Sequence, residues 1–211
     1  MEHEFWHERW KNREIGFHRN DVHPLLMQHF GAIAKPGAMV FVPLCGKSLD
    51  MKWLLEQGYQ VLGIELNQSA IEEFFAEHNM KPRVHQEGPF RVYRAPAVTL
   101  YQGDFFSLTA NHLHGVDVWY DRAAMVALPP TMREQYTSHL QRVLTTHQPG
   151  LVVAVEYAEN YWKGPPFAIF SDEINQAYKR RYQVAELPLI KGFSLGGDPN
   201  VTERGYLLTV N

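Results

Sequence analysis

The sequence lacks the features that mark several classes of protein. Its 211 residues include one cysteine, Cys45, which excludes an intramolecular disulfide. The longest apolar runs, 38–45 and 151–155, have the length of strands and fall far short of the roughly 20 residues that cross a bilayer. The first residues carry charges of both signs and no apolar stretch of the kind found in secretory signals. We therefore expect a cytoplasmic protein with no membrane partner.

An excess of basic charge is also missing. The 20 Lys and Arg residues are dispersed among 23 Asp and Glu residues, and the formal net charge is −3. A nucleic-acid-binding domain needs a basic patch or stripe, so we expect no nucleic-acid partner. With 45% hydrophobic and 13% aromatic residues, a chain of this length can bury one large core. We expect a single domain over residues 1–211, acting as a monomer.

Strand-like and helix-like patterns alternate along the chain. A stretch that contains Pro and Gly at 81–96 should form a hairpin, and the two final strands have no helix between them. The expected strands are 39–45, 59–66, 98–101, 116–120, 151–157, 182–189 and 206–210, and the expected helices are 47–58, 68–78, 130–144 and 172–180. Pro130 suits a helix start, and Ser171 is the expected N-cap of the last helix. This layout predicts an α/β fold with a doubly wound, mostly parallel seven-stranded sheet.

The most informative stretch runs from residue 38 to Glu65. A hydrophobic strand leads through the turn 43–48 into an amphipathic helix, and a second strand ends at Glu65, nineteen residues after Gly46. Dinucleotide-binding folds place an acid about 20 residues beyond the glycine turn, where it binds ribose hydroxyls. The pattern therefore predicts a nucleoside-bearing ligand at the carboxyl ends of the strands.

The turn itself indicates which nucleoside fits. A dinucleotide site uses G-x-G-x-x-G to approach a pyrophosphate, but the turn P-L-C-G-K-S has one glycine. Gly46, Lys47 and Ser48 do match the end of the phosphate loop G-x-x-x-x-G-K-[ST], although Phe41 replaces its first glycine and Pro43 lies inside the loop. A ribose-binding acid without a diphosphate cradle favours S-adenosylmethionine, with a nucleotide phosphotransferase as the alternative.

Longer segments carry a more specific resemblance. The chain contains, in this order, FWHERWKNREIGFH, FVPLCGKSLDMKWLLEQGYQVLGIEL, LYQGDFF, WYDRAAMVALPP and GPPF. Together these segments resemble the thiopurine S-methyltransferase family, most of all its bacterial members, over about residues 5–210. The resemblance implies the sheet of class I S-adenosylmethionine-dependent methyltransferases and S-adenosylmethionine as methyl donor. It also implies aromatic and heterocyclic thiols as acceptors and, for bacterial members, methylation of selenium and tellurium compounds in detoxification.

The resemblance assigns residues to the site and a lid to residues 1–30. The donor would contact Trp10, Leu44, Gly46, Glu65, Asp104, Phe105 and Arg122, and the acceptor would contact Phe17, Pro165 and Pro166. Arg122 is also expected to orient the acceptor, since its planar guanidinium can engage a carboxylate, a ring nitrogen or an oxyanion. An aromatic lid suits a sulfonium, because aromatic faces attract cations. The role of Trp6 stays open.

The implied reaction needs little acid–base catalysis. A soft sulfur or selenium atom attacks the methyl group in line, and an acidic heteroaromatic thiol is already partly ionised near neutral pH, so alignment in a dry site suffices. Asp121 is a candidate acceptor for a thiol proton. Cys45 lies in the cofactor turn, and we expect no covalent role for it. A protein that binds S-adenosylmethionine without catalysis is a second alternative.

One further motif points to a different chemistry. The segment from His3 to His7 satisfies H-E-x-x-H, which on a helix can hold zinc between two imidazoles. It lies at the extreme N-terminus, where chains fray, and no third ligand follows it nearby. We therefore expect no metal site, and we expect His112 and His114 to be loop residues.

Overall fold

The computed structural model describes residues 3–210, and of His3 the backbone alone. Within that part of the chain, one nine-stranded sheet follows the order β3-β4-β5-β2-β1-β6-β7-β9-β8. Strands β5, β2, β1, β6 and β7 run parallel to one another, and the remaining pairs are antiparallel. The strands are β1 (Met39–Val42), β2 (Gln60–Glu65), β3 (Arg83–Glu87), β4 (Phe90–Ala95), β5 (Val98–Gln102), β6 (Val118–Arg122), β7 (Gly150–Glu156), β8 (Tyr182–Glu186) and β9 (Thr202–Val210).

The sheet confirms the doubly wound α/β fold and corrects the expected strand number. The seven predicted strands are present in the order β5-β2-β1-β6-β7-β9-β8. The predicted hairpin also forms, as β3 and β4, but it pairs with β5 and so extends the sheet to nine strands. Phe90, Val92 and Tyr93 of β4 are buried by this pairing. A hairpin alone is marginally stable in water, which is why it adds to the open edge of β5.

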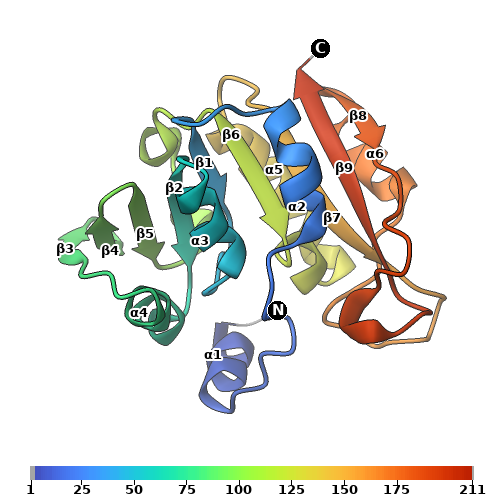
Figure 1. The fold of residues 1–211 in the computed structure, drawn as a ribbon, viewed down its shortest axis with the longest axis horizontal. Helices are drawn as coiled ribbons and strands as arrows, with labels where there is room; N and C mark the ends of the chain where they lie inside the picture. The colour runs from blue at the N-terminus through green and yellow to red at the C-terminus, as the bar shows by residue number, and fades with distance from the viewer. Residues whose placement is uncertain (1–2, 211) are drawn as a thin grey trace.

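Helices cover both faces of the sheet (Figure 1). The helices α2, α3 and α4 pack apolar side chains into the core on one face, and α5 and α6 pack into the core on the other face. Helix α1 stands apart from both layers, at the end toward which the parallel strands run (Figure 1). The helices are α1 (His3–Lys11), α2 (Pro24–His29), α3 (Leu49–Glu56), α4 (Gln68–Glu77), α5 (Pro130–Val143) and α6 (Ser171–Tyr178), and the 3₁₀ segments are η1 (Phe30–Ala32), η2 (Phe105–Ser107), η3 (Ala110–Leu113), η4 (Met125–Ala127) and η5 (Leu195–Gly197).

The start of helix α5 agrees with the prediction, and the start of helix α6 differs from it. Pro130 is the first residue of α5, as predicted. Helix α6 begins one residue earlier than expected, at Ser171, so its N-cap is Phe170, which makes no side-chain cap bond. The prediction of Ser171 as the N-cap is therefore wrong. Asp172 in the first turn supplies the negative charge that a helix N-terminus favours.

Two elements depart from the expected bounds. Helix α2 has six residues, too few to show a helical period, yet its Leu25 and Leu26 are buried in the core. Strand β9 begins at Thr202, four residues before the predicted start, because it pairs with β7 as far as Glu156. The long pairing matters for the site, since it places the side chain of Glu203 inside the fold, 5% exposed.

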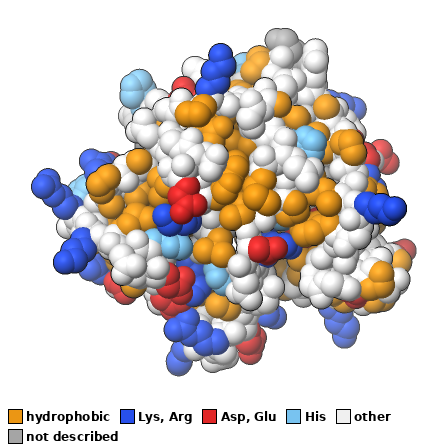
Figure 2. Space-filling model, viewed as in Figure 1, with side chains coloured by type: hydrophobic (Ala, Val, Ile, Leu, Met, Phe, Trp, Pro, Cys, Tyr) orange, Lys and Arg blue, Asp and Glu red, His pale blue; other side chains and the backbone are white. Residues whose placement is uncertain are grey.

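Charge is dispersed over the surface in view. Figure 2 shows Lys and Arg side chains scattered near the edges of one face, interspersed with Asp and Glu, and no continuous basic band crosses that face. Among residues 3–210, no helix combines the length and the apolar character needed to span a bilayer.

Candidate active site

A cavity of about 660 Å³ lies at the carboxyl ends of the central strands. This size is within the roughly 300–1,000 Å³ typical of ligand pockets. Its walls come from α1 and the turn after it, from the segments that follow β1, β2, β5 and β6, from the 162–166 loop, and from β9. All the residues predicted to contact donor or acceptor line it, namely Trp10, Phe17, Leu44, Gly46, Glu65, Asp104, Phe105, Arg122, Pro165 and Pro166.

The turn after β1 is built around the carboxylate of Glu65. The backbone N–H of Gly46 donates to Glu65 Oε2 over 2.9 Å, and that of Asn67 donates to Oε1 over 2.8 Å. Leu44 and Gly46 both adopt positive φ, at 45° and 53°. Such a φ is strained for a leucine, and backbone strain of this kind clusters at functional sites.

Burial and hydrogen bonding act in opposite directions on Glu65. The residue is 6% exposed, and this burial raises the pKa of its carboxyl, while the N–H groups of Asn67, Gly46 and Leu66 partly counteract the rise. A carboxylate has about four acceptor sites on its two oxygens. Beyond the hydrogen bonds from Gly46 and Asn67, the carboxylate therefore keeps acceptor capacity, which suits a pair of neighbouring hydroxyls.

The phosphate-loop alternative does not fit this turn. The N–H of Gly46 is directed to Glu65 rather than to a ligand. The ammonium of Lys47 lies 2.9 Å from Glu73 Oε2 and 2.5 Å from Glu77 Oε1 on α4. A phosphate placed here would meet two carboxylates that already neutralise the lysine. The nest of free N–H groups that phosphate loops present is therefore not formed at this turn.

Aromatic side chains close the cavity from the α1 side. The ring of Phe17 packs edge-on against both Trp6 and Trp10, with centroid distances of 5.8 and 5.6 Å. Trp10 is 4% exposed and reaches the turn after β1, since a Cβ added to Gly46 would lie 3.3 Å from its Cζ2 atom. Trp6, whose role the sequence left open, also lines the cavity.

Ion pairs tie this aromatic cover to the body of the fold. Both carboxylate oxygens of Glu73 on α4 accept from Arg13 Nη1, over 2.7 Å each. Glu73 also receives Lys47, so one carboxylate joins the segment after α1 to the turn after β1.

Arg122 reaches the cavity from the end of β6. Its Nη2 donates to the carbonyl oxygen of Phe17 over 3.2 Å, and its Nε lies 3.8 Å from Asp50 Oδ2. Asp50 is fixed in turn, because it accepts from the backbone N–H of His23 and the hydroxyl of Tyr120 over 2.8 and 3.0 Å. The guanidinium is thus oriented by a buried carboxylate rather than by the adjacent Asp121.

The side chain of Asp121 is buried and hydrogen-bonded within the fold. Its carboxylate accepts from the Tyr136 hydroxyl over 2.7 Å and from the N–H of Met125 over 3.1 Å. The residue is 1% exposed, and burial raises its pKa to about 6. Among the described residues it is not part of the cavity lining. The suggestion that Asp121 accepts a thiol proton is therefore not supported by its position.

Asp104 and Phe105 lie where β5 gives way to η2. Asp104 Oδ1 caps this turn by accepting from the N–H of Phe106 over 2.9 Å. Phe105 is 4% exposed, and its ring packs against Tyr136 and His139 with centroid distances of 4.9 and 5.0 Å. The pair presents an aromatic face beside a carboxylate, which is the arrangement predicted for an adenine contact.

The side of the cavity next to Pro165 and Pro166 has an apolar wall and one carboxylate that the sequence did not predict. The hydroxyl of Tyr157 donates to the Pro166 carbonyl over 2.8 Å and so anchors the 165–166 segment. Residues on this wall that were not predicted are Val126, Leu128, Met132, Val153, Val155, Trp162 and Leu195. The missed acid is Glu203, which lies 3.3 Å from both Arg19 and His23. No local motif marks it, because only the pairing of β9 with β7 brings it here.

No metal centre is found in the described part of the chain. Its His, Cys, Asp and Glu side chains form no group of three or more that could hold a metal ion. The side chain of His3 from the H-E-x-x-H motif lies outside the described residues, and His7 Nδ1 lies 3.3 Å from the Asn67 side-chain amide. Cys45 is buried, and burial raises the pKa of its thiol well above the ordinary value, which disfavours a nucleophilic role.

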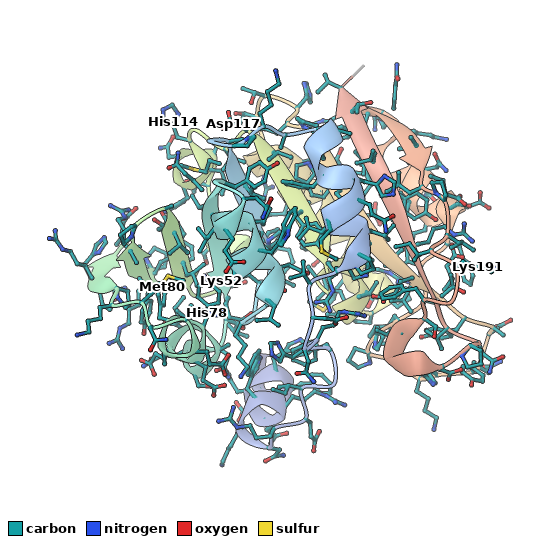
Figure 3. All side chains as sticks on the ribbon, viewed as in Figure 1. Lys52, His78, Met80, His114, Asp117 and Lys191 are labelled. Carbon is teal, nitrogen blue, oxygen red and sulfur yellow. The ribbon has the colours of Figure 1, made fainter. Side chains whose placement is uncertain are left out.

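His112 and His114 lie away from the cavity. His112 belongs to η3 rather than to a loop, and its Nδ1 bonds to Thr109. Figure 3 shows His114 at the end of the sheet opposite α1, near Asp117. Neither residue lines the cavity in the part of the molecule that the structure describes.

Comparison with solved structures supports the fold assignment. A TehB-like S-adenosylmethionine-dependent methyltransferase from Corynebacterium glutamicum superposes with a TM-score of 0.59 at 16% identity, over 99% of this chain and 98% of that one. The 1,6-didemethyltoxoflavin-N1-methyltransferase of Burkholderia thailandensis, solved with S-adenosylhomocysteine, gives 0.62 at 12% identity, over 98% and 84%. At such identities the likeness concerns the fold, which is that of S-adenosylmethionine-dependent methyltransferases.

Comparison with known sequences shows to which family the chain belongs. A sequence model of the thiopurine S-methyltransferase family matches residues 1–192. The thiopurine S-methyltransferase of Pseudomonas aeruginosa strain UCBPP-PA14 is 46% identical over 206 residues, which are 97% of this chain and 94% of that protein. That of Pseudomonas fluorescens strain Pf-5 is 42% identical over an alignment 216 positions long, which covers 99% of this chain and 97% of that protein. The chain therefore belongs to the thiopurine S-methyltransferase family and is a methyltransferase enzyme.

Proposed function

We propose that the cavity binds S-adenosylmethionine and that the enzyme methylates the sulfur of aromatic or heterocyclic thiols such as thiopurines, with selenium and tellurium compounds as further acceptors. The observation that carries the proposal is Glu65, whose buried carboxylate accepts the backbone N–H groups of Gly46 and Asn67 and retains acceptor capacity. No metal takes part in this proposal.

The donor half of the cavity fits S-adenosylmethionine. Glu65 would bind the ribose hydroxyls, Asp104 and Phe105 would contact the adenine, and Leu44 with Gly46 would face the methionine part. Trp10 would cover the sulfonium, because an aromatic face attracts a cation by about 0.5–2 kcal/mol. When bound, S-adenosylmethionine would supply an electrophilic methyl group, whose carbon a soft nucleophile attacks in line while the sulfonium sulfur leaves as a thioether.

The acceptor half fits a flat apolar ring with one polar edge. Phe17, Pro165 and Pro166 supply apolar surface, and Arg122 supplies a fixed cation oriented by Asp50. A guanidinium stabilises a thiolate or the ring nitrogen of a heterocycle. The chain then contributes alignment, exclusion of water and one positive charge, which is what an in-line displacement by a soft nucleophile requires.

The two Pseudomonas relatives are named thiopurine S-methyltransferases, and these names support the assignment. The proposal includes the remaining expectations, namely a single domain over residues 1–211 and a monomer without a nucleic-acid partner. It also keeps a lid within residues 1–30, of which α1 and Phe17 line the cavity while Leu25 and Leu26 belong to the core. A cytoplasmic location stays a prediction.

A titration combined with an assay tests the function. We expect calorimetry to show binding of S-adenosylmethionine and S-adenosylhomocysteine without added metal, and the same sample to methylate a heteroaromatic thiol. Binding without turnover on any thiol or selenium acceptor would favour the non-catalytic alternative. Binding of ATP alone, dependent on magnesium and lost in Lys47→Ala, would establish the phosphotransferase instead.

A further inference from the structure

One proton of the proposed reaction has no acceptor among the residues discussed so far. A thiol whose pKa lies above the ambient pH enters the cavity protonated, and its sulfur becomes a good nucleophile only as the proton leaves. Asp121 does not take it, because its carboxylate is 1% exposed and engaged by Tyr136 and Met125.

The carboxylates that do line the cavity each have other contacts that make them poor proton acceptors for the thiol. Glu65 is held by the cofactor turn. Glu203 lies beside Arg19 and His23; burial acts to raise its pKa, but His23, Arg122 and Arg19 outweigh this and lower it, which makes it a weak base. Glu14 has a side chain 55% exposed at the rim, 3.7 Å from Arg9. Asp104 caps η2 at the predicted adenine end.

Among the described residues that line the cavity, His18 is the remaining basic side chain with a lone pair to offer. It directly follows Phe17, whose carbonyl oxygen accepts from Arg122 Nη2 over 3.2 Å. Its own backbone N–H donates to Ile15 over 2.8 Å, which fixes a tight turn. The hydrogen bond from Arg122 therefore places the His18 residue next to the guanidinium that would hold the acceptor.

The surroundings of His18 keep its imidazole neutral near pH 7. Burial lowers its pKa below the ordinary 6.5, and the positive charges of Lys47 and Arg122 add to this effect, while Glu77 and Glu73 oppose it. Lys47 is itself paired with both glutamates. A neutral imidazole has one nitrogen that accepts a proton, so the ring of His18 can act as a base at physiological pH.

We propose that His18 is the proton acceptor of the reaction and that its imidazole takes the proton of the acceptor thiol beside Arg122. This inference rests on the proposed function. The S–H electron pair stays on the acceptor sulfur and forms the new S–C bond, while the C–S bond of the donor breaks and its pair returns to the donor sulfur. The proton ends on an imidazole nitrogen. The sulfonium charge disappears as the imidazolium charge forms, so the net charge of the cavity is conserved.

A series of thiols of different acidity tests the role at fixed pH. In His18→Gln at pH 7, we expect kcat/KM to fall by about 100-fold or more, the range of general-base catalysis, for thiols whose pKa is well above 7. The loss should shrink to a few-fold for thiols that are already ionised. His114→Gln, an exposed histidine at the opposite end of the sheet (Figure 3), is the matched control and should leave every thiol unaffected. An equal loss for all thiols, or no loss, would overturn the proposal.

A measurement without turnover tests the contact directly. With S-adenosylhomocysteine in the donor site, NMR titration of His18 is compared for an acidic thiol bound as its thiolate and for the corresponding S-methyl thioether. A thiolate in contact with the imidazole should raise the pKa of His18 by about 1 or more relative to the thioether, as an adjacent opposite charge does. Identical titrations with both ligands would refute the contact.

Wild-type turnover separates this inference from the function on which it rests. If the wild-type enzyme methylates ionised thiols but His18→Gln treats all thiols alike, the function stands and the role of His18 falls. If the wild-type enzyme methylates no thiol while it binds S-adenosylmethionine, the proposed function falls, and the proton acceptor falls with it.

Discussion

At the scale of single residues, the carboxylate of Glu65 restricts most strongly which ligands the cavity can bind. Its two oxygens each accept one backbone N–H, so the side chain cannot turn away from the cavity without breaking the turn after β1. An anionic ligand group at this position would be repelled, whereas a pair of hydroxyls would complete the acceptor capacity of the carboxylate. The residue thus selects a ribose and disfavours a phosphate.

Glu65→Gln should weaken binding of the donor strongly. The amide nitrogen must face either the N–H of Gly46 or that of Asn67, and the charge-assisted bonds to the ribose are lost, at about 1.5–3 kcal/mol each. We expect calorimetry with S-adenosylhomocysteine to show affinity reduced by about 100-fold or more. Glu56→Gln, on the exposed face of α3 with its side chain 54% exposed, is the control. Unchanged affinity in Glu65→Gln would contradict the ribose assignment.

The residues found from sequence share one property. Glu65 and Arg122 end strands, and Leu44 and Asp104 follow strands, whose carboxyl ends meet at one rim of the sheet. That rim is implied by the alternation of strands and helices. Glu203 was missed because it lies on β9, whose antiparallel pairing with β7 carries it to the rim. Asp50 was missed as the partner of Arg122 because the contact joins α3 to β6 and has no sequence spacing of its own.

At the scale of elements, helix α1 and the turn after β1 form one unit. Trp10 of α1 fits over Gly46, and the left-handed backbone of Gly46 brings the turn up to the indole. The sequence predicted both segments but not this contact, since the fit depends on the absence of a single Cβ. It likewise predicted the hairpin at 81–96 but not its addition to β5, because pairing along an open edge leaves no mark in the hairpin itself.

Gly46→Ala should displace α1 and weaken donor binding. Alanine at φ 53° is strained, by about 1–3 kcal/mol, and its Cβ would lie 3.3 Å from Trp10 Cζ2. Gly88→Ala is a matched control, because Gly88 has φ 54° with no atom within 4 Å of its added Cβ. We expect both variants to lose similar backbone stability in thermal unfolding, and Gly46→Ala alone to lose affinity for S-adenosylhomocysteine. Equal affinities would show that α1 does not act as a lid.

At the scale of the whole molecule, the buried charge of Asp121 couples folding to pH. The pKa of this carboxyl is raised from 3.8 to about 6, chiefly by burial, against the Tyr136 and Met125 hydrogen bonds. The folded protein therefore holds this proton more tightly than the unfolded chain. The resulting stabilisation is complete below pH 4 and is lost as the pH rises to about 6, at a cost of about 3 kcal/mol.

Asp121→Asn removes this dependence without removing the hydrogen bonds. The amide oxygen can still accept from Met125, and the Tyr136 hydroxyl can rotate to accept from the amide nitrogen. Urea unfolding should show that the free energy of unfolding of the variant minus that of wild type is larger at pH 7 than at pH 4 by up to about 3 kcal/mol, so that the variant gains stability relative to wild type as the pH rises. Taking this difference cancels the contributions of other titrating groups, and Asp172→Asn, exposed at the start of α6, should show no such change. A relative stability that is the same at both pH values would mean that folding does not raise the pKa of Asp121, and that its carboxylate is solvated more than its burial implies.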